Sequence, residues 1–495
     1  MADGMIAMDP DLNWKAMKKA GKQLFQRLGA LRDVQIMMEW IEKLKLREIA
    51  GHSEGPATSN EAGPGSGIAA RVETPQSPAQ ALVRILEGRE VQLKREARAA
   101  LEEFDRKQWR QWSKSLPPRA ARIRPGSAVF KHLALERWTT ARQLHTAALR
   151  NRSQVAFHTL RIGIKRFRYI VENFLPVEHA AWADDLKHMQ DLLGEVHDLD
   201  VLWATAISCR IFPDDDARKS WHERIVAERT KRIGEYRQRT TGSDSLWDLW
   251  RAGLPQGKQI GDIATRRMKL WAKVLDPDFA HSERVARFCL QLYDGLTAAG
   301  FFSNPARENA AADGDPRASL MAAALLHDVG KVKGNKGHHK ESQELIQKHG
   351  TPLGWEETDM RRAALVARFH CGALPARSHK TLRDLLADEQ RVVIRLAAIL
   401  RLANAFDVAH DGHVRRLKIE YSAVPPRRAN GLPYKRVAPA QREALIVGAE
   451  GFVEGSRTAQ AVAGERYLLE TVLRRPIVVK AMKDGPSAPR QPRQA

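Results

Sequence analysis

The sequence predicts a mainly α-helical protein: a pseudo-repeated helical bundle, then an all-helical domain that ends in a small α/β tail. Three observations predict this class. Apolar residues recur at spacings of three and four through most of residues 12–407. One short segment occurs twice in the first half of the chain, which is typical of a repeated unit. Strand-like alternation of apolar and polar residues is confined to the region after residue 415.

Taken in order, the periodic segments predict helices over residues 12–48, 79–115, 128–149, 155–174 and 180–209, and helices again through 259–407. Residues 51–78 are rich in Gly, Ser, Pro and Thr and predict a flexible insert. Proline-rich punctuation over 116–127 predicts a break between helices. The expected domains are therefore a bundle over 10–240, a linker over 241–265, a helical domain over 266–425, an α/β tail over 426–482 and a disordered end over 483–495.

Composition limits the partners and the compartment. The 495 residues carry a formal net charge of +22, which predicts a polyanion as partner: nucleic acid, an anionic membrane surface or inorganic polyphosphate. The three cysteines are scattered, as is usual in a reducing cytoplasm. No signal peptide is visible, and no apolar run approaches the roughly 18 residues of a membrane span. A cytoplasmic protein without a membrane segment is expected, and its oligomeric state is left open.

The repeat is the clearest sign of the bundle. Residues 28–34, LGALRDV, match residues 193–199, LGEVHDL. The upstream apolar stripes also align, and they consist of Met17, Gly21, Leu24, Leu28 and Leu31 in one copy and Trp182, Leu186, Met189, Leu193 and Val196 in the other. Two copies of one helical unit predict a pseudo-symmetric bundle.

The segment FHTLRIGIKRFRYIVENF predicts a helix with one cationic face. Residues at helical spacing place five polar side chains together, namely His158, Arg161, Lys165, Arg168 and Tyr169. Lys15, Lys18 and Lys22 form a similar stripe in the first repeat. Rows of donors one turn apart suit a chain of phosphates. A solvated basic helix face is the alternative interpretation of both stripes.

Together with MQDLLGEVHDLDVL, that helix resembles the second half of a CHAD domain, and LGALRDVQIMMEWIEKL resembles the end of its first half. The resemblance covers about residues 10–240. It implies a helical domain that binds inorganic polyphosphate through the eight residues named above. It also implies that the His/Arg helix expected to open the first half is missing or lies upstream.

A second motif, AALLHDVGK, ends an apolar helical run with His327 and Asp328. His281 lies upstream, and His338, His339 and His370 lie downstream. Histidine and carboxylate sets bind transition metals or Mg²⁺ and activate water for attack on phosphorus. The order resembles the HD superfamily of metal-dependent phosphohydrolases.

Residues 266–480 resemble the C-terminal HD-like region of the exopolyphosphatase/guanosine pentaphosphate phosphatase family, through segments such as HSERVARFCLQLYDGL, GHHKES and VIRLAAILRLANAFDVAH. No segment resembles that family's actin-like domain, so its exopolyphosphatase chemistry is not carried over. The resemblance implies a metal site made of His281, His327, Asp328, His339, His370 and Asn404. Asn404 stands where an aspartate is expected, with Asp407 nearly one turn further on. Asp328 and Lys331 are the expected catalytic residues, Lys331 as a phosphate contact.

The sequence thus favours a polyphosphate-binding protein with an HD-type phosphohydrolase domain that uses Mn²⁺, Mg²⁺ or another divalent metal on a phosphoanhydride or phosphoester. The alternative is a non-catalytic binder or scaffold at polyphosphate granules with a degenerate HD domain, which Asn404 favours. An RNA-binding protein is a third hypothesis, weakened by the lack of an aromatic-plus-basic motif. Each histidine taken alone also fits a hydrogen-bonded core residue. For His338, His339 and His370 a loop surface fits equally well. His410 and His413 fit a polar loop, and Cys371 fits an incidental neighbour.

Overall fold

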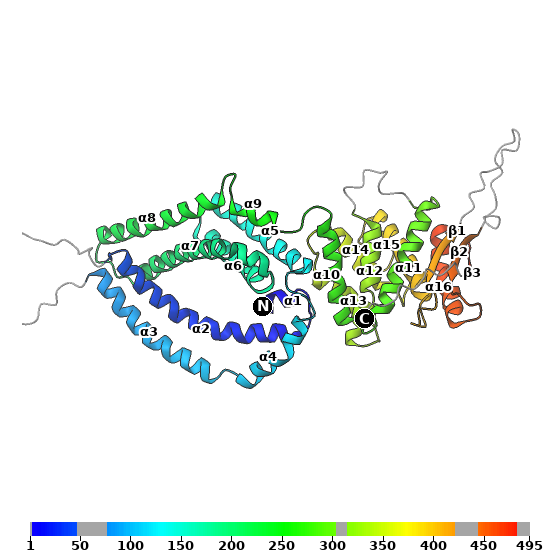
Figure 1. Ribbon diagram of the computed structural model, residues 1–495, viewed down its shortest axis with the longest axis horizontal. Helices are drawn as coiled ribbons and strands as arrows, with labels where there is room; N and C mark the ends of the chain where they lie inside the picture. The colour runs from blue at the N-terminus through cyan, green and yellow to red at the C-terminus, as the bar shows by residue number, and fades with distance from the viewer. Residues whose placement is uncertain (1, 47–76, 303–313, 421–443, 483–495) are drawn as a thin grey trace, which may run out of the picture. The chain divides into compact units, whose positions relative to one another are not determined.

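A computed structural model describes residues 2–46, 77–302, 314–420 and 444–482. The described chain is mainly α-helical and has one three-stranded sheet near its C-terminal end, as the sequence predicted (Figure 1). Residues 1–259 and 260–495 form two compact units. The expected flexible insert, apart from residues 77–78, and the expected disordered end lie outside the described residues. None of the described helices is long and apolar enough to cross a bilayer.

The first unit is a bundle of helices, α1(Ala2–Ile6), α2(Leu12–Lys43), α3(Pro78–Glu102), α4(Arg106–Ala120), α5(Ala128–Asn151), α6(Gln154–Phe174), α7(Pro176–Ser208), α8(Asp215–Thr240) and α9(Leu246–Ala252). The two repeat copies lie in α2 and α7, which contact each other. Helix α3 packs on α2 and helix α8 packs on α7 (Figure 1), so each repeat helix has a partner that follows it in the chain. The duplicated sequence therefore corresponds to a duplicated helical pair.

Burial differs between the two copies of the apolar stripe. All five residues in α7 are buried, whereas Met17, Leu24, Leu28 and Leu31 in α2 are only half-buried. The shared core lies further along both helices, where Val34 and Ile41 of α2 meet Leu199 and Leu202 of α7. The repeat therefore predicted that α2 and α7 are equivalent helices. How deeply each apolar stripe is buried depends on neighbouring helices, which differ between the two copies.

Helix α6 follows its sequence pattern closely. The Ser153 side chain accepts a hydrogen bond from the Ala156 N–H and caps the helix. Leu160, Ile164 and Phe167 are fully buried, as the apolar face predicted. The opposite, cationic face lies against α7, where His158 contacts His197 and Arg168 contacts Gln190.

The boundaries agree with the expectation at one place and differ from it at two. The break expected over 116–127 is confirmed, because α4 ends at Ala120 and α5 begins at Ala128, although Pro117 and Pro118 still lie inside the last turn of α4. A further break, which was not expected, falls at residues 103–105, where Asp105 caps α4. The segment 241–265, expected as a linker, contains α9 and the start of α10. Trp247 and Trp250 are fully buried and anchor α9 on α5 and α8. The Gly and Pro content of this segment concealed the packing supplied by its tryptophans.

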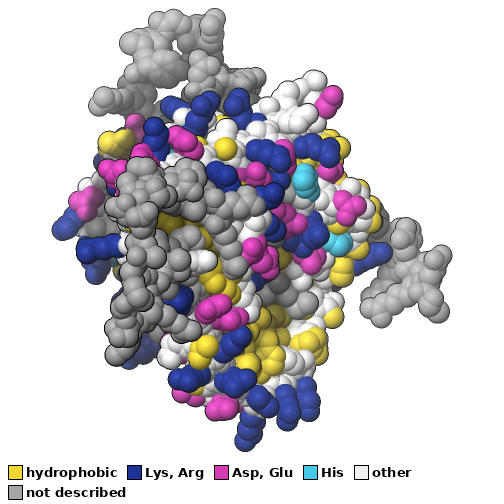
Figure 2. Space-filling view, turned by 90° about the vertical axis from the view of Figure 1, so that its left-hand side faces the viewer, with side chains coloured by type: hydrophobic (Ala, Val, Ile, Leu, Met, Phe, Trp, Pro, Cys, Tyr) yellow, Lys and Arg dark blue, Asp and Glu magenta, His cyan; other side chains and the backbone are white. Residues whose placement is uncertain are grey.

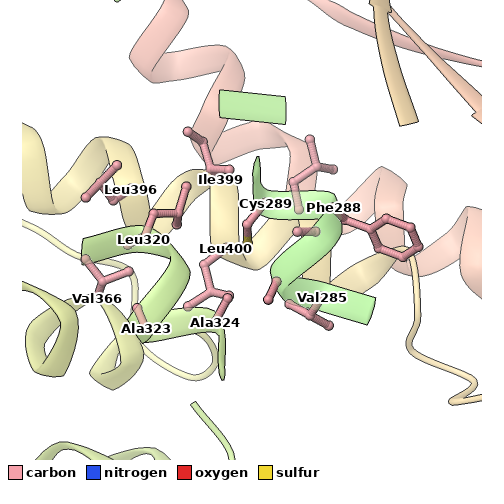
Figure 3. Packing of buried hydrophobic residues seen from close by; sticks show 14 of the residues in the cluster. Val285, Phe288, Cys289, Leu320, Ala323, Ala324, Val366, Leu396, Ile399 and Leu400 are labelled. Atoms are coloured by element: carbon pink, nitrogen blue, oxygen red, sulfur yellow. The ribbon is translucent and has the colours of Figure 1, made fainter. Parts of the chain in front are cut away.

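The second unit contains α10(Gln259–Leu275), α11(Phe279–Ala298), α12(Pro316–Leu326), a 3-10 helix over Val329–Lys333, α13(His338–His349), α14(Glu357–Arg368), α15(Ala387–Ala405) and α16(Arg457–Leu473). Helix α12 lies at its centre and contacts α11, α14 and α15. Its small residues, such as Ala323 and Ala324, let these neighbours approach closely (Figure 3). Phe288 and Leu400 complete a continuous core around it. The rigid centre is therefore the helix that leads into the His327 and Asp328 pair.

The tail is a three-stranded sheet. Strand β1(Arg416–Glu420) pairs antiparallel with β2(Leu445–Glu450), and β2 pairs parallel with β3(Ile477–Met482). Helix α16 connects the two parallel strands and packs on α15, while β1 packs on α11. The strands and α16 agree with the predicted α/β tail, but β1 begins before residue 426, within the segment assigned to the helical domain.

Candidate functional site

Helix α12 ends at the residues that form the centre of the site. His327 is its C-cap residue and is fully buried, and its Nδ1 lies 2.8 Å from the Ala324 carbonyl oxygen. Nδ1 therefore donates, and Nε2 presents its lone pair to the interior. Nε2 lies 3.3 Å from Asp328 Oδ2 and has no hydrogen-bond partner among the described residues. A buried, unpartnered nitrogen beside a carboxylate is a ready ligand atom.

Two more imidazoles reach Asp328 from α13 and from the end of α14. His338 Nδ1 lies 2.7 Å from the Asn335 carbonyl oxygen, and His370 Nδ1 lies 2.7 Å from the Ala367 carbonyl oxygen. Their Nε2 atoms lie 2.9 Å from each other, and 3.3 Å and 3.6 Å from Asp328 Oδ1. Each backbone contact fixes the ring and leaves Nε2 facing the site.

His281 completes the inner group from α11. Its Nδ1 lies 2.7 Å from Asp407 Oδ2, and its Nε2 lies 2.9 Å from Asn404 Oδ1 and 3.9 Å from Asp328 Oδ2. Arg284 also donates to the Asp407 carboxylate at 2.8 Å. Asp407 therefore orients His281 from outside, and Asn404 occupies the inner position expected for the fourth ligand.

The charges around Asp328 favour its ionised form. Burial alone would raise the pKa of its carboxyl group, but His327, His338 and His370 hold that pKa far below its ordinary value. For His338, contacts with Asp328 and Cys371 raise the pKa of the imidazole to about 10. Burial keeps the pKa of His370 well below its ordinary value. The group thus joins one carboxylate to several imidazoles, and the contacts of His338 favour a second proton on its ring.

The donor set fits a divalent cation. Nitrogen and carboxylate ligands suit Mn²⁺, Fe²⁺, Ni²⁺ or Zn²⁺, and an amide oxygen adds a weaker oxygen ligand. Two groups of three residues have their ligand atoms within 4.8 Å of one another. One group is His281, His327 and Asp328, and the other is Asp328, His338 and His370. The unpartnered Nε2 of His327 and the opposed Nε2 atoms of His338 and His370 are the features that a cation would satisfy.

The structure distributes the predicted residues unevenly. His281, His327, Asp328, His370 and Asn404 lie together, whereas His339 lies further out with His338 and Cys371. Lys331 Nζ lies 2.5 Å from Asp328 Oδ2 at the partly exposed edge. Three residues were missed as parts of the site: His338, Asp407 in its supporting role, and His410, whose ring stacks on His281 with centroids 3.9 Å apart. The pair in GHHKES was a signal for His338, but nothing in the sequence pointed to the stacking of His410.

The cationic face of α6 lies beside α7. His158 Nδ1 lies 3.2 Å from His197 Nδ1, and Arg168 donates to Gln190 Oε1 at 3.1 Å. Lys165 lies over the ring of Tyr169, 5.7 Å from its centroid. Most of these side chains are half-buried, so their charges are concentrated between helices and are less screened than on an open face.

Arg161 faces the two equivalent aspartates of the repeat. Burial raises the pKa of Asp198 to about 6, although Arg161 opposes this shift and Asp33 adds to it. Burial also raises the pKa of Asp33, again against Arg161. The symmetric LGxxxD segments therefore place two carboxylates next to the central arginine of the cationic face.

The lysine stripe of α2 borders a pocket of about 730 Å³ in the first unit. Lys18 and Lys22 line it together with Arg166 and Tyr169 of α6 and Arg137 of α5, while Lys15 does not. Lys18 also forms an ion pair with Asp3. On the face shown in Figure 2, Lys and Arg side chains are interspersed with Asp and Glu. The pocket therefore brings four cations, Lys18, Lys22, Arg137 and Arg166, around one space, with Asp3 also in its lining.

Comparison with family models supports the division of the chain. Residues 7–206 match the CHAD domain, and residues 263–428 match Ppx/GppA phosphatase, domain III. The chain thus joins a CHAD domain to a Ppx/GppA-like region, as the sequence analysis predicted. No curated protein matches the chain. CHAD domains are associated with polyphosphate binding, and the two matches together support a polyphosphate-related function.

Proposed function

We propose that this protein binds inorganic polyphosphate or a similar polyanion through its CHAD domain and hydrolyses a phosphoanhydride or phosphoester at the Asp328 site. The observation that carries the hydrolytic part is the convergence of the Nε2 atoms of His281, His327, His338 and His370 on the buried Asp328 carboxylate. The backbone and Asp407 bind the Nδ1 atoms of these rings. The Nε2 atoms face other potential ligand atoms, those of Asp328, Asn404 and one another, and His327 Nε2 has no hydrogen-bond partner among the described residues.

His281, His327, Asp328 and His370 would hold the cation, with Asn404 Oδ1 as a weaker oxygen ligand. When bound, a divalent cation would polarise a phosphoryl oxygen and lower the pKa of a water molecule. Asp407 keeps His281 in the tautomer that presents Nε2, since it accepts from Nδ1 at 2.7 Å. Asp328 would also orient the water, because its carboxylate lies between the imidazoles.

The chain's own cations supply the anion specificity. Lys331, Lys333, Lys336 and Lys340 follow Asp328 within twelve positions, and the last three are exposed. Lys331 touches the Asp328 carboxylate, so an arriving phosphoryl group would find its ammonium at the edge of the site. The cations of the CHAD domain would hold the rest of a long chain and raise its effective concentration.

Phosphate release tests the proposal. Purified protein with Mn²⁺ or Mg²⁺ is incubated with polyphosphate or with phosphorylated guanine nucleotides. Removing a metal-binding imidazole by His327→Ala should lower the rate by about 100-fold or more. His188→Ala, at an exposed position in the first unit, is the matched control and should retain the rate. Equal background release by wild type and His327→Ala would refute hydrolysis at this site.

A second function, a non-catalytic polyphosphate scaffold at cytoplasmic granules, is favoured by one observation. A neutral amide, Asn404, contacts His281 at 2.9 Å where the HD resemblance implies a carboxylate. An amide holds a divalent cation less tightly because it adds no charge. Polyphosphate binding without a bound metal and without phosphate release would establish the scaffold in place of the hydrolase.

A further inference from the structure

A third group of potential ligands lies at the outer edge of the Asp328 site. His338, His339 and Cys371 bring one ligand atom each within 4.8 Å of the others, and all three are half-buried. Cys371 Sγ lies 3.8 Å from His338 Nε2. The two histidines begin α13, and the cysteine follows the end of α14, so two packed helices hold the group in place.

The backbone at Gly372 makes room for this arrangement. Its φ of +71° suits glycine, and a Cβ there would lie 3.6 Å from the ring of His339. His339 therefore lies directly beside the residue that follows Cys371. His338 presents Nε2, since its Nδ1 contacts the Asn335 carbonyl oxygen at 2.7 Å.

The outer group shares no residue with the inner set of His281, His327 and Asp328. Two cations can therefore be bound at once without competing for a ligand. The intermediate set consists of Asp328, His338 and His370. It shares Asp328 with the inner set and His338 with the outer set, so it cannot bind a cation while both of those sets bind one. His370 remains available to either cation.

The two sets differ in chemical character. The inner set contains a carboxylate and lies beside an amide oxygen, which suits harder cations such as Mn²⁺. The outer set offers one sulfur and two imidazoles, and thiolate with imidazole is a preferred combination for Zn²⁺. The inner set would therefore prefer harder cations, and the outer set would prefer softer ones such as Zn²⁺.

We propose that His338, His339 and Cys371 form a second, thiophilic cation site of the Zn²⁺ class beside the Asp328 site. Its open side would take water or an anionic oxygen, because three protein ligands leave a fourth position of a tetrahedral ion unfilled. A cation there adds positive charge at the edge where Lys331 lies. This assignment goes beyond the proposed hydrolysis and does not require it.

Cobalt spectroscopy of the full, tag-free chain tests the assignment. A thiolate bound to Co²⁺ gives a sulfur-to-metal charge-transfer band in the near ultraviolet, which imidazole and carboxylate ligands do not give. We expect this band in wild type, its loss in Cys371→Ser, and its retention in His281→Ala. Cys209→Ser, at the other half-buried cysteine, is the matched control and should keep the band. Absence of the band in wild type at saturating Co²⁺, or its persistence in Cys371→Ser, would overturn the site.

Metal counting gives a second, independent measurement. After dialysis against Zn²⁺, elemental analysis should find one ion fewer per chain in both Cys371→Ser and His339→Ala than in wild type. If Cys371→Ser fails to fold, His339→Ala alone decides the result, and an unchanged zinc content there would refute the site. A retained cobalt band without any phosphate release would contradict the proposed hydrolysis and leave the outer site supported.

Discussion

The Nε2 atoms of His338 and His370 lie 2.9 Å apart, although each ring directs its Nδ1 at a backbone carbonyl oxygen. A carbonyl can only accept, so each Nδ1 carries a proton. Two neutral rings would then oppose lone pairs at contact distance. A proton or a cation between them removes this repulsion, and Asp328 nearby stabilises either positive charge. This pair explains why the buried histidine cluster is better suited to an ion than to a closed core.

Restoring the expected carboxylate should strengthen the inner site. Asn404→Asp places a negative charge beside His281 Nε2, where the amide oxygen now lies 2.9 Å away. We expect Mn²⁺ or Mg²⁺ to bind about tenfold more tightly, because ligand charge governs the affinity of oxygen sites for hard cations. Titration calorimetry measures the change, with Asn151→Asp as a matched control at an exposed position. Unchanged or weaker binding would place the cation elsewhere.

The cationic face of α6 predicts how binding depends on salt. Changing Arg161, Lys165 and Arg168 together to Ala should weaken polyphosphate binding and reduce the slope of log affinity against log salt by about three. Helicity should persist, since the buried face of α6 is unchanged. The control variant replaces three exposed cations, Arg95, Arg98 and Lys107, with Ala. It should reduce the affinity and the salt slope less than the α6 variant does. Equal effects of both variants would indicate a diffuse surface in place of a site.

The buried carboxyl group of Asp198 predicts a dependence of stability on pH. Burial raises its pKa to about 6 in the folded state, above the ordinary value of 3.8. Between these two values the folded state binds more protons than the unfolded state, so stability decreases as pH rises through that window. Asp198→Asn removes the charge. Its stability advantage over wild type should grow to the order of 1 kcal/mol between about pH 4 and pH 6, because solvent screens part of the effect.

Urea denaturation across that pH range measures the difference, and Asp191→Asn at an exposed position is the control. The same substitution leaves Arg161 with one carboxylate fewer beside it. We therefore also expect Asp198→Asn to bind polyphosphate more tightly at pH 7. A constant stability difference at all pH values would show that Asp198 does not titrate in this window.

Gly330 holds the backbone that positions His338. A Cβ at this residue would lie 2.1 Å from the His338 carbonyl oxygen and 2.6 Å from the Ser342 nitrogen, and neither backbone atom can move independently of α13. Gly330→Ala should destabilise the protein by about 1–3 kcal/mol. Gly29→Ala is the matched control: nothing lies within 4 Å of its Cβ position in α2, so we expect a gain of about 0.5–1 kcal/mol. Thermal melts compare the two, and equal melting temperatures would contradict the close approach at Gly330.

The sequence predicted the elements whose periodicity is strong. For helix α6 the sequence shows a serine before the first turn and an apolar face. In the structure the serine caps the helix and the apolar face is buried. Helix α9 was missed because its tryptophans pack on α5 and α8, which local composition does not reveal. Pro117 and Pro118 lie in the final turn of α4, and the helix ends at Ala120, within the segment where the sequence predicted a break. Tertiary packing decided the case of α9 against the local signal.

The grouping of site residues was less predictable than their types. His338 and His370 are 32 positions apart and meet only because α13 packs on α14. The sequence offered two adjacent histidines, His338 and His339, and the family pattern favoured the second. The structure directs His338 to Asp328 and leaves His339 further out, beside His338 and Cys371, since successive residues on a helix point in different directions. The role of Asp407 was equally hard to predict. Its carboxylate contacts His281 Nδ1, the nitrogen that faces away from the site, and sequence spacing alone cannot distinguish this supporting contact from direct binding of a metal.

The metal content of the tag-free protein is the most direct test of the central claim that the histidines around Asp328 hold a divalent cation. Elemental analysis is performed on wild type, His327→Ala and the control His188→Ala after equilibration with Mn²⁺ and extensive dialysis. We predict about one equivalent of manganese in wild type and in the control, and a loss of that equivalent in His327→Ala. A wild-type chain that retains no manganese, or a His327→Ala variant that retains as much as wild type, would contradict the account.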